Sequence, residues 1–280
     1  MTIAHLSRLD GARALITGAS RGIGRKVAET LADAGADVVV SARTLGALDD
    51  VVRAVEERGR KAVAVAGDLA EPGTGAAVVD QAAAALGGLD IIVHSAGIVP
   101  QSDDGTTVLL PFQDFPPDQW ARVIDVNLNA TAAVCRAAHP HLLGSDRASL
   151  LLVSSCAGVM GTPLLDAYAV TKAAQLSLTR SLAVSWAGQG IRVNALCPGW
   201  TRTEMTAFAA DQAPVSEWLI SHVPMGRWAD PKEIAAVALF LCSPAASFVT
   251  GHALLVDGGL SIADGGLAGT PKPPSPFAPA

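Results

Sequence analysis

One tyrosine and one lysine are spaced so that they could transfer a proton. Tyr168 is the only tyrosine in the 280-residue chain, and Lys172 is one of five lysines. Residues 166–187 read as a helix, on which side chains four positions apart share a face. A fixed ammonium there is expected to lower the phenol pKa below its usual value of about 10. The alternative is an exposed tyrosine that precedes a lysine by one turn. Ser155, thirteen residues upstream, ends a predicted strand.

A glycine-rich turn near the N-terminus could cradle a pyrophosphate. An apolar strand predicted over 12–17 runs into a GxxxGxG spacing, and a helical pattern follows over 25–34. Such a turn lets the backbone approach phosphate closely, and the helix start offers free N–H donors and a positive dipole end. The alternative is a glycine-rich helix start with no ligand. The predicted loop residues are Gly18, Ser20, Arg21, Gly22, Ile23 and Gly24.

Alternating strands and helices position these groups. Strands are predicted over 12–17, 36–42, 62–66, 89–94, 148–154, 192–196 and 252–257, and helices over 25–34, 45–58, 73–86, 118–143, 166–187 and 231–241. Continuous apolar strands separated by helices indicate a parallel sheet covered on both faces. The predicted fold class is α/β: a single doubly wound Rossmann-type domain with about seven strands. Ligands of such sheets bind beyond the carboxyl ends of the strands.

Three segments interrupt this alternation. Residues 100–117 read as a surface loop near the substrate end. Residues 201–225 lie between a strand end and the next helix, and we expect a substrate lid there, with an ordinary surface helix pair as the alternative. The domain is expected to span 1–263, and the Gly/Pro-rich tail 264–280 to be disordered or lightly packed.

Composition excludes several function classes. The net charge is −6 with no basic block, which argues against a nucleic-acid partner. No apolar run approaches the roughly 20 residues of a membrane span, and no signal peptide is expected. The four scattered cysteines, without a CxxC pair, indicate reduced thiols in a cytoplasmic protein and no metal site.

Taken in order, these motifs resemble those of the classical short-chain dehydrogenase/reductase family from Leu9 to about Ile262. The resemblance implies a catalytic set of Asn127, Ser155, Tyr168 and Lys172, with Asn127 holding a water that links Lys172 to solvent. It implies a cofactor site that adds Thr44, Asp68, Leu69, Ser95, Ala96, Gly97, Pro198, Gly199, Thr201 and Thr203 to the glycine loop, Tyr168 and Lys172. It also implies a homotetramer.

One position departs from the family pattern. The family's Asn-Asn-Ala-Gly after the fourth strand is His94-Ser95-Ala96-Gly97 here. His94 is interpreted as a structural stand-in for asparagine, and a catalytic base is the alternative.

The second strand predicts the cofactor. It ends at Arg43 and Thr44, and no carboxylate occurs between Asp37 and Asp49. An acidic residue there would bind a free ribose 2′-hydroxyl, whereas an arginine pairs with a 2′-phosphate. Arg21 resembles the second cation of NADP-preferring relatives. NADP(H) is therefore favoured over NAD(H).

The sequence thus predicts an NADP(H)-dependent oxidoreductase that interconverts a ketone and a secondary alcohol. The alternatives are an NAD-dependent polyol or sugar-acid dehydrogenase, a 3-oxoacyl-carrier-protein reductase, and a catalytically silent dinucleotide-binding regulator. An apolar pocket favours a cyclic or medium-sized ketone. Its expected wall residues are Leu164, Leu165, Trp200, Met205 and Phe208.

Overall fold

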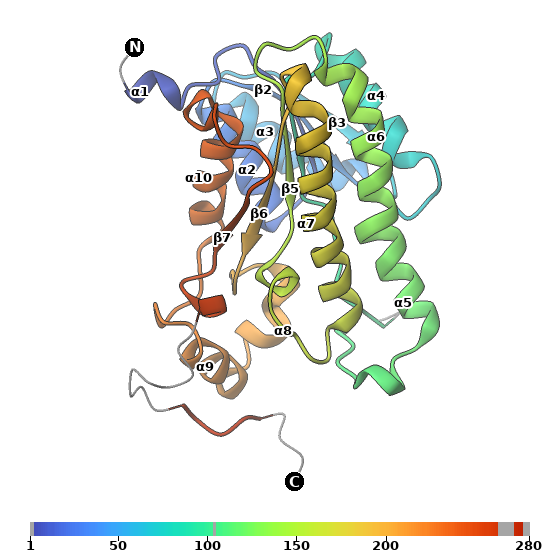
Figure 1. Cartoon of the computed structure of the whole chain (residues 1–280), viewed down its shortest axis with the longest axis vertical. Helices are drawn as coiled ribbons and strands as arrows, with labels where there is room; N and C mark the ends of the chain where they lie inside the picture. Colours follow the sequence, from blue (N-terminus) through green and yellow to red (C-terminus); the bar gives the residue numbers. More distant parts are fainter. Residues whose placement is uncertain (1–2, 103–104, 263–271, 277–280) are drawn as a thin grey trace.

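Seven short apolar strands form one parallel sheet at the centre of the computed structural model, which describes residues 3–102, 105–262 and 272–276 (Figure 1). The strands are β1 (Arg13–Thr17), β2 (Asp37–Ala42), β3 (Ala62–Ala66), β4 (Ile91–His94), β5 (Ser149–Val153), β6 (Arg192–Pro198) and β7 (Ala253–Val256). Their order is β3-β2-β1-β4-β5-β6-β7, and every neighbouring pair is parallel. The predicted α/β class and strand number are confirmed.

Helices cover both faces of the sheet. In Figure 1, α2 and α10 lie on one side, and α4, α6 and α7 on the other. The α-helices are α1 (Ile3–Leu6), α2 (Gly22–Asp33), α3 (Asp49–Glu56), α4 (Thr74–Leu86), α5 (Pro117–Ile124), α6 (Ala130–Leu142), α7 (Asp166–Trp186), α8 (Ala207–Ala210), α9 (Ala213–Ser221) and α10 (Pro231–Cys242). Shorter 3-10 turns are η1 (Leu45–Leu48), η2 (Phe112–Asp114), η4 (Cys156–Gly158), η5 (Ala187–Gln189), η6 (Glu204–Thr206), η7 (Pro244–Ala246) and η8 (Leu260–Ile262).

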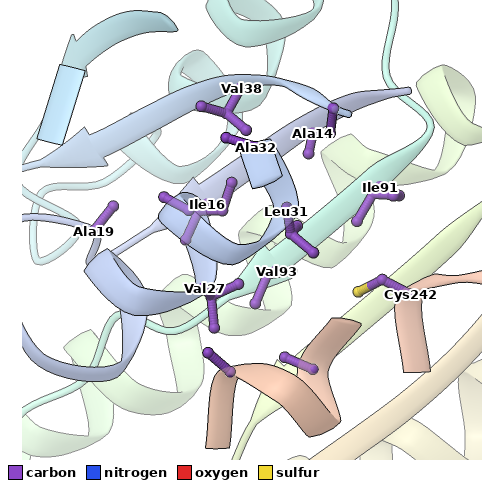
Figure 2. Close-up of a cluster of buried hydrophobic side chains, with 14 of the residues drawn as sticks. Ala14, Ile16, Ala19, Val27, Leu31, Ala32, Val38, Ile91, Val93 and Cys242 are labelled. Carbon is purple, nitrogen blue, oxygen red and sulfur yellow. The ribbon is translucent and has the colours of Figure 1, made fainter. Parts of the chain in front are cut away.

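The core consists of two apolar layers separated by the sheet. Successive strand residues point to opposite faces, so Ala14 and Ile16 of β1 join the layer under α2, α3 and α10, whereas Leu15 joins the layer under α4, α6 and α7. Figure 2 shows the first layer, where Val27 and Leu31 of α2 point at the sheet. The two covered faces leave only the strand ends for a site.

The long helix predicted over 118–143 is interrupted. A π-helical turn, η3 (Asp125–Asn129), separates α5 from α6. The wider turn accompanies a carbonyl of Asn127 that accepts side-chain hydrogen bonds from Thr131 and Gln175. Sequence periodicity misses such turns because they shift the helical phase by one residue only. Other predicted boundaries differ by one to three residues, and the predicted helix over 45–58 starts as the 3-10 turn η1.

The segment expected to form a lid consists of η6, α8 and α9, which lie beyond the end of β6 (Figure 1). The predicted tail lies outside the described residues except for 272–276. Within the described ranges, no helix has the length and apolar character needed to cross a membrane.

The packing of α2 generates a stability prediction. Leu31 is fully buried between the sheet and α10, so Leu31→Ala should lower the free energy of unfolding by about 2–5 kcal/mol through lost contacts and a cavity. Val184→Ala, on an 84% exposed residue of α7, should change it by less than about 0.5 kcal/mol. Urea unfolding measures both, and equal effects would contradict the described core.

Candidate active site

The predicted proton-transfer pair lies near the start of α7. Tyr168 and Lys172 are one turn apart, and the Lys172 Nζ atom lies 5.4 Å from the centroid of the Tyr168 ring. Lys172 is only 3% exposed, and its ammonium donates to the carbonyl of Val153 at 2.8 Å. Because β5 ends at Val153, this bond holds the lysine at the carboxyl end of the sheet. A buried cation therefore lies beside the phenol.

The structure corrects the predicted direction of the Tyr168 pKa. Although part of the residue is exposed, desolvation of the phenol raises its pKa to about 12, and the hydrogen bond with Ser155 only partly opposes this. Burial also lowers the pKa of Lys172 to about 8, because desolvation disfavours the charged ammonium. Helical spacing reveals a nearby cation but not the loss of water around both groups. At neutral pH the phenol therefore keeps its proton.

Ser155 occupies the turn that follows β5 and caps η4. Its Oγ accepts the N–H of Ala157 at 3.1 Å, and its hydroxyl also interacts with the Tyr168 phenol. The neighbouring Ser154 hydroxyl donates to the carbonyl of Lys172 at 2.9 Å. These bonds join the end of β5 to α7. The structure thus brings Ser155, Tyr168 and Lys172 together.

Asn127 lies in the π turn and is fully buried. Its side chain binds the backbone of Ile98 twice: Oδ1 accepts the N–H at 2.8 Å, and Nδ2 donates to the carbonyl at 2.8 Å. These bonds fix the segment that follows β4. The Asn127 carbonyl accepts from Gln175 Nε2 at 2.9 Å and from Thr131 Oγ1 at 2.7 Å.

His94 is fully buried at the end of β4. Its Nδ1 atom lies 2.9 Å from Thr17 Oγ1, and the same hydroxyl oxygen accepts the N–H of Ala96 at 3.2 Å. Burial lowers the pKa of His94 to about 3, and the charge of Lys172 adds to this. The contacts join the ends of β1 and β4. They favour the structural interpretation of His94 over a catalytic base.

The glycine turn passes close to the loop after β4. Gly18 has a φ of 65°, and a Cβ built on it would lie 2.7 Å from the Cα of Ala96. Any side chain at this position would therefore collide with backbone. The Ala19 N–H donates to the Ser41 carbonyl at 3.0 Å, so the turn also lies against the end of β2. Helix α2 starts at Gly22 without a side-chain cap, which leaves its first N–H groups free for an anion.

Two cations flank this turn. Arg43 and Thr44 directly follow β2, and Arg21 immediately precedes α2. Both arginines are exposed, and neither guanidinium has a hydrogen-bond or ion-pair partner among the residues that the structure describes. The carboxylate of β2, Asp37, lies at the opposite end of the strand, where it pairs with Arg60 at 2.7 Å. The end of β2 thus offers positive charge and no acid.

The next two strand ends carry further predicted cofactor residues. Asp68 and Leu69 follow β3, and Asp68 Oδ1 accepts the backbone N–H two residues later at 3.0 Å. Residues 95–97 follow β4. A Cβ on Gly97 would lie 3.4 Å from Lys172 Nζ, so this segment passes directly beside the buried cation.

The segment after β6 also lies at the carboxyl end of the sheet. Pro198 ends the strand, the Gly199 N–H donates to β7 at 3.0 Å, and the Thr201 hydroxyl donates to the carbonyl of Gly199 at 3.1 Å. Thr203 caps η6. A Cβ on Gly22 would lie 3.3 Å from Thr203 Cγ2, so the segment reaches the start of α2.

An apolar cluster lies beside Ser155 at the predicted substrate end. It contains Trp200, as expected, and six residues that sequence reasoning did not single out: Cys156, Met160, Ile220, Val223, Leu255 and Leu260. The other expected wall residues, Leu164, Leu165, Met205 and Phe208, are not members of it. The lid region, β7 and η8 meet only in the folded chain, so sequence order could not reveal the set. Arg202, a cation of this region, is exposed and pairs with Asp211 at 3.0 Å.

Sequence reasoning also missed Gln175. It is fully buried on α7, and its amide contacts both Lys172 and Asn127. The available signal was its spacing: a glutamine three residues after Lys172 lies on the same helical face.

Comparisons with known proteins find related dehydrogenases and reductases. A family model described as Enoyl-(Acyl carrier protein) reductase matches residues 18–261. The chain is 35% identical over 265 residues to the gluconate 5-dehydrogenase of Gluconobacter oxydans, covering 94% of this chain and 99% of that protein. It is 39% identical over 246 residues to the cis-4-hydroxycyclohexanecarboxylate dehydrogenase of Sinomonas cyclohexanicum, covering 88% and 95%.

A similar solved structure is a gluconate 5-dehydrogenase of Burkholderia cenocepacia in complex with NADP and tartrate. Its TM-score to this chain is 0.86 at 35% identity, covering 94% of this chain and 100% of that chain.

The single tyrosine allows the raised phenol pKa to be tested directly. Tyrosinate absorbance reports Tyr168 alone, because the chain has no other tyrosine. In the folded protein, little tyrosinate should form at pH values near 10, since burial raises this pKa to about 12. The protein unfolded in guanidinium should be half ionised near pH ~10. Ionisation of the folded protein at or below the pH of the unfolded one would contradict the described burial.

Proposed function

The chain belongs to the short-chain dehydrogenase/reductase family, and from this we propose that it is an NADP(H)-dependent oxidoreductase that interconverts a ketone and a secondary alcohol. The observation that carries the proposal is the convergence of Ser155, Tyr168 and the buried Lys172 at the end of β5. The close approach of Gly18 and the uncapped start of α2 fit a dinucleotide beside them.

The family resemblance implies which residues would hold the cofactor. The N–H groups at the start of α2 would bind the pyrophosphate, Asp68 would face the adenine, and Lys172 would bind the nicotinamide ribose. When bound, the nicotinamide supplies or accepts a hydride.

The proton chemistry is assigned to the chain itself. Tyr168 would donate its phenolic proton to the substrate oxygen during reduction and take it back during oxidation. Ser155 would donate a hydrogen bond to the same oxygen and so fix its position. Lys172 would stabilise negative charge on the phenol oxygen, because an opposite charge a few ångströms away favours the ionised form.

The apolar cluster supports a substrate class. A cation in the site binds a carboxylate substrate most strongly, whereas the cluster beside Ser155 is apolar and Arg202 pairs with Asp211. We therefore favour a neutral cyclic or medium-sized ketone. The second candidate is a sugar acid, favoured by the similarity to gluconate 5-dehydrogenases over nearly the whole chain.

A substrate panel with one variant tests this function. Wild type should oxidise or reduce members of a panel of cyclic ketones, polyols and sugar acids, followed by nicotinamide absorbance. Tyr168→Phe should lower kcat by about 10²–10⁴-fold, because the acid/base group is lost. Cofactor affinity, measured by quenching of tryptophan fluorescence, should remain nearly unchanged and serves as the control. Full activity of the variant would exclude this role, and silence of the wild type across the panel would favour the regulator.

The preference for NADP(H) rests on two exposed arginines beside the glycine turn, Arg43 after β2 and Arg21 before α2. A guanidinium can bind a 2′-phosphate through paired, charge-assisted hydrogen bonds worth about 1.5–3 kcal/mol each. At about 1.4 kcal/mol per factor of ten, Arg21 and Arg43 together support a preference of roughly a hundredfold.

The preference is tested by comparing kcat/KM for NADP(H) and NAD(H) on one substrate. Wild type should prefer NADP(H), and Arg43→Ala should reduce the preference about tenfold or more because one phosphate partner is removed. Arg53→Ala, which changes another exposed arginine on α3, is the matched control and should leave the ratio unchanged. Equal use of both cofactors by the wild type would refute the assignment.

Two further properties rest on the sequence alone. Assembly as a homotetramer and a cytoplasmic location stay predictions, and exposed apolar residues of the single chain, such as Phe248, are compatible with assembly.

A further inference from the structure

Gln175 connects the buried lysine to the π turn. Its side chain is fully buried one turn beyond Lys172 on α7. Oε1 accepts a hydrogen bond from Lys172 Nζ at 3.2 Å. Nε2 donates to the carbonyl of Asn127 at 2.9 Å and to Thr131 Oγ1 at 2.9 Å. Both ends of the amide are therefore engaged, and the side chain has one defined orientation.

The groups around Lys172 are uncharged, so its ammonium depends on the hydrogen bond to Gln175. The lysine faces Tyr168 on its own helix, His94 from β4 and Cys197 from β6, and burial keeps all three of these uncharged at neutral pH. No carboxylate pairs with Lys172 among the described residues. The ammonium is instead stabilised by two neutral oxygens: the Val153 carbonyl and Gln175 Oε1. Loss of either acceptor would leave a buried charge with a single partner.

The same amide links Lys172 to Asn127. The Asn127 carbonyl accepts the Gln175 N–H, so lysine, glutamine and asparagine form a continuous chain of hydrogen bonds between protein groups.

We propose that Gln175 is a positioning residue, whose amide holds the Lys172 ammonium beside Tyr168 and anchors it to the π turn at Asn127. The effect on turnover rests on the proposed oxidoreductase function, but the effect on Lys172 does not. Removing the Gln175 carbonyl destabilises the ammonium and lowers its pKa further. The phenol then has less positive charge beside it, so phenolate forms at higher pH, and the rise of alcohol oxidation with pH moves upward.

The lysine can be observed directly. The chain has five lysines, and burial lowers the pKa of Lys172 to about 8. NMR of protein labelled at the lysine side chains therefore follows Lys172 without any assay, and its signal is assigned by its loss in Lys172→Met.

The principal variant is Gln175→Met, which keeps the length of the side chain and removes its hydrogen-bonding groups. We expect the Lys172 pKa to fall by about one unit, which corresponds to a tenfold change in its protonation equilibrium. We also expect kcat/KM for alcohol oxidation to fall about twofold at neutral pH, because the charged fraction of Lys172 falls from about nine-tenths to about one half, with the pH profile displaced to higher pH. The matched control is Thr179→Val, which removes a buried hydroxyl one turn further along α7 that bonds the Gln175 backbone carbonyl and not Lys172. Its Lys172 titration and pH profile should match wild type.

A second variant covers the case in which Gln175→Met does not fold. Thr131→Val removes one acceptor of the Gln175 amide and keeps the glutamine itself, so it should lower the Lys172 pKa and shift the profile in the same direction by a smaller amount. An unchanged Lys172 titration in folded Gln175→Met, or in Thr131→Val where only that variant folds, would overturn the proposal. The proposal would also be overturned if the control Thr179→Val shifted the Lys172 pKa as much as Gln175→Met does. A wild type without turnover would contradict the proposed function, whereas the titration would still decide the role of Gln175.

Discussion

The site depends on keeping one ammonium charged while almost no water reaches it. Burial of a lysine without a carboxylate partner is costly, and proteins accept it only where hydrogen-bond acceptors surround the charge. Lys172 has two such acceptors, the end of β5 and Gln175, and its own backbone carbonyl is bound by Ser154. These contacts fix α7 against the sheet. The placement of Tyr168 and of the loop at Gly97 follows from where the lysine is held.

The parallel sheet is what brings the other groups to this point. Because all seven strands run the same way, residues that follow β1, β2, β4, β5 and β6 meet along one edge. Contacts between the strand ends then set their spacing. The Ala96 N–H donates to the Thr17 hydroxyl, and the Ala19 N–H donates to the Ser41 carbonyl. Gly18 allows the glycine turn to approach the backbone of Ala96 closely. The two apolar layers carry the stability, so the edge can hold buried polar groups.

Much of the fold and part of the site could be predicted from the sequence, because these features depend on patterns of neighbouring residues. The order of strands and helices follows from apolar runs and turn residues, and the pairing of Tyr168 with Lys172 follows from helical spacing. Two features could not be predicted. The π turn at Asn127 accompanies a bond from Gln175 to the Asn127 carbonyl, and only tertiary packing brings Gln175 into reach. The Tyr168 pKa depends on how much water the fold removes, and spacing carries no information about solvent.

The two shifted pKa values describe a coherent starting state for chemistry. Loss of water around both groups raises the phenol pKa to about 12 and lowers the ammonium pKa to about 8. At neutral pH Tyr168 is therefore neutral and Lys172 is mostly charged. A neutral phenol can give a proton to a carbonyl oxygen, and the adjacent cation stabilises the phenolate that remains. The reverse direction needs the phenolate first. As the pH rises, Lys172 loses its proton before Tyr168 does, and the group that stabilises the phenolate is weakened. An acceptor that keeps the ammonium protonated, such as Gln175, therefore matters most for the direction that begins from the alcohol.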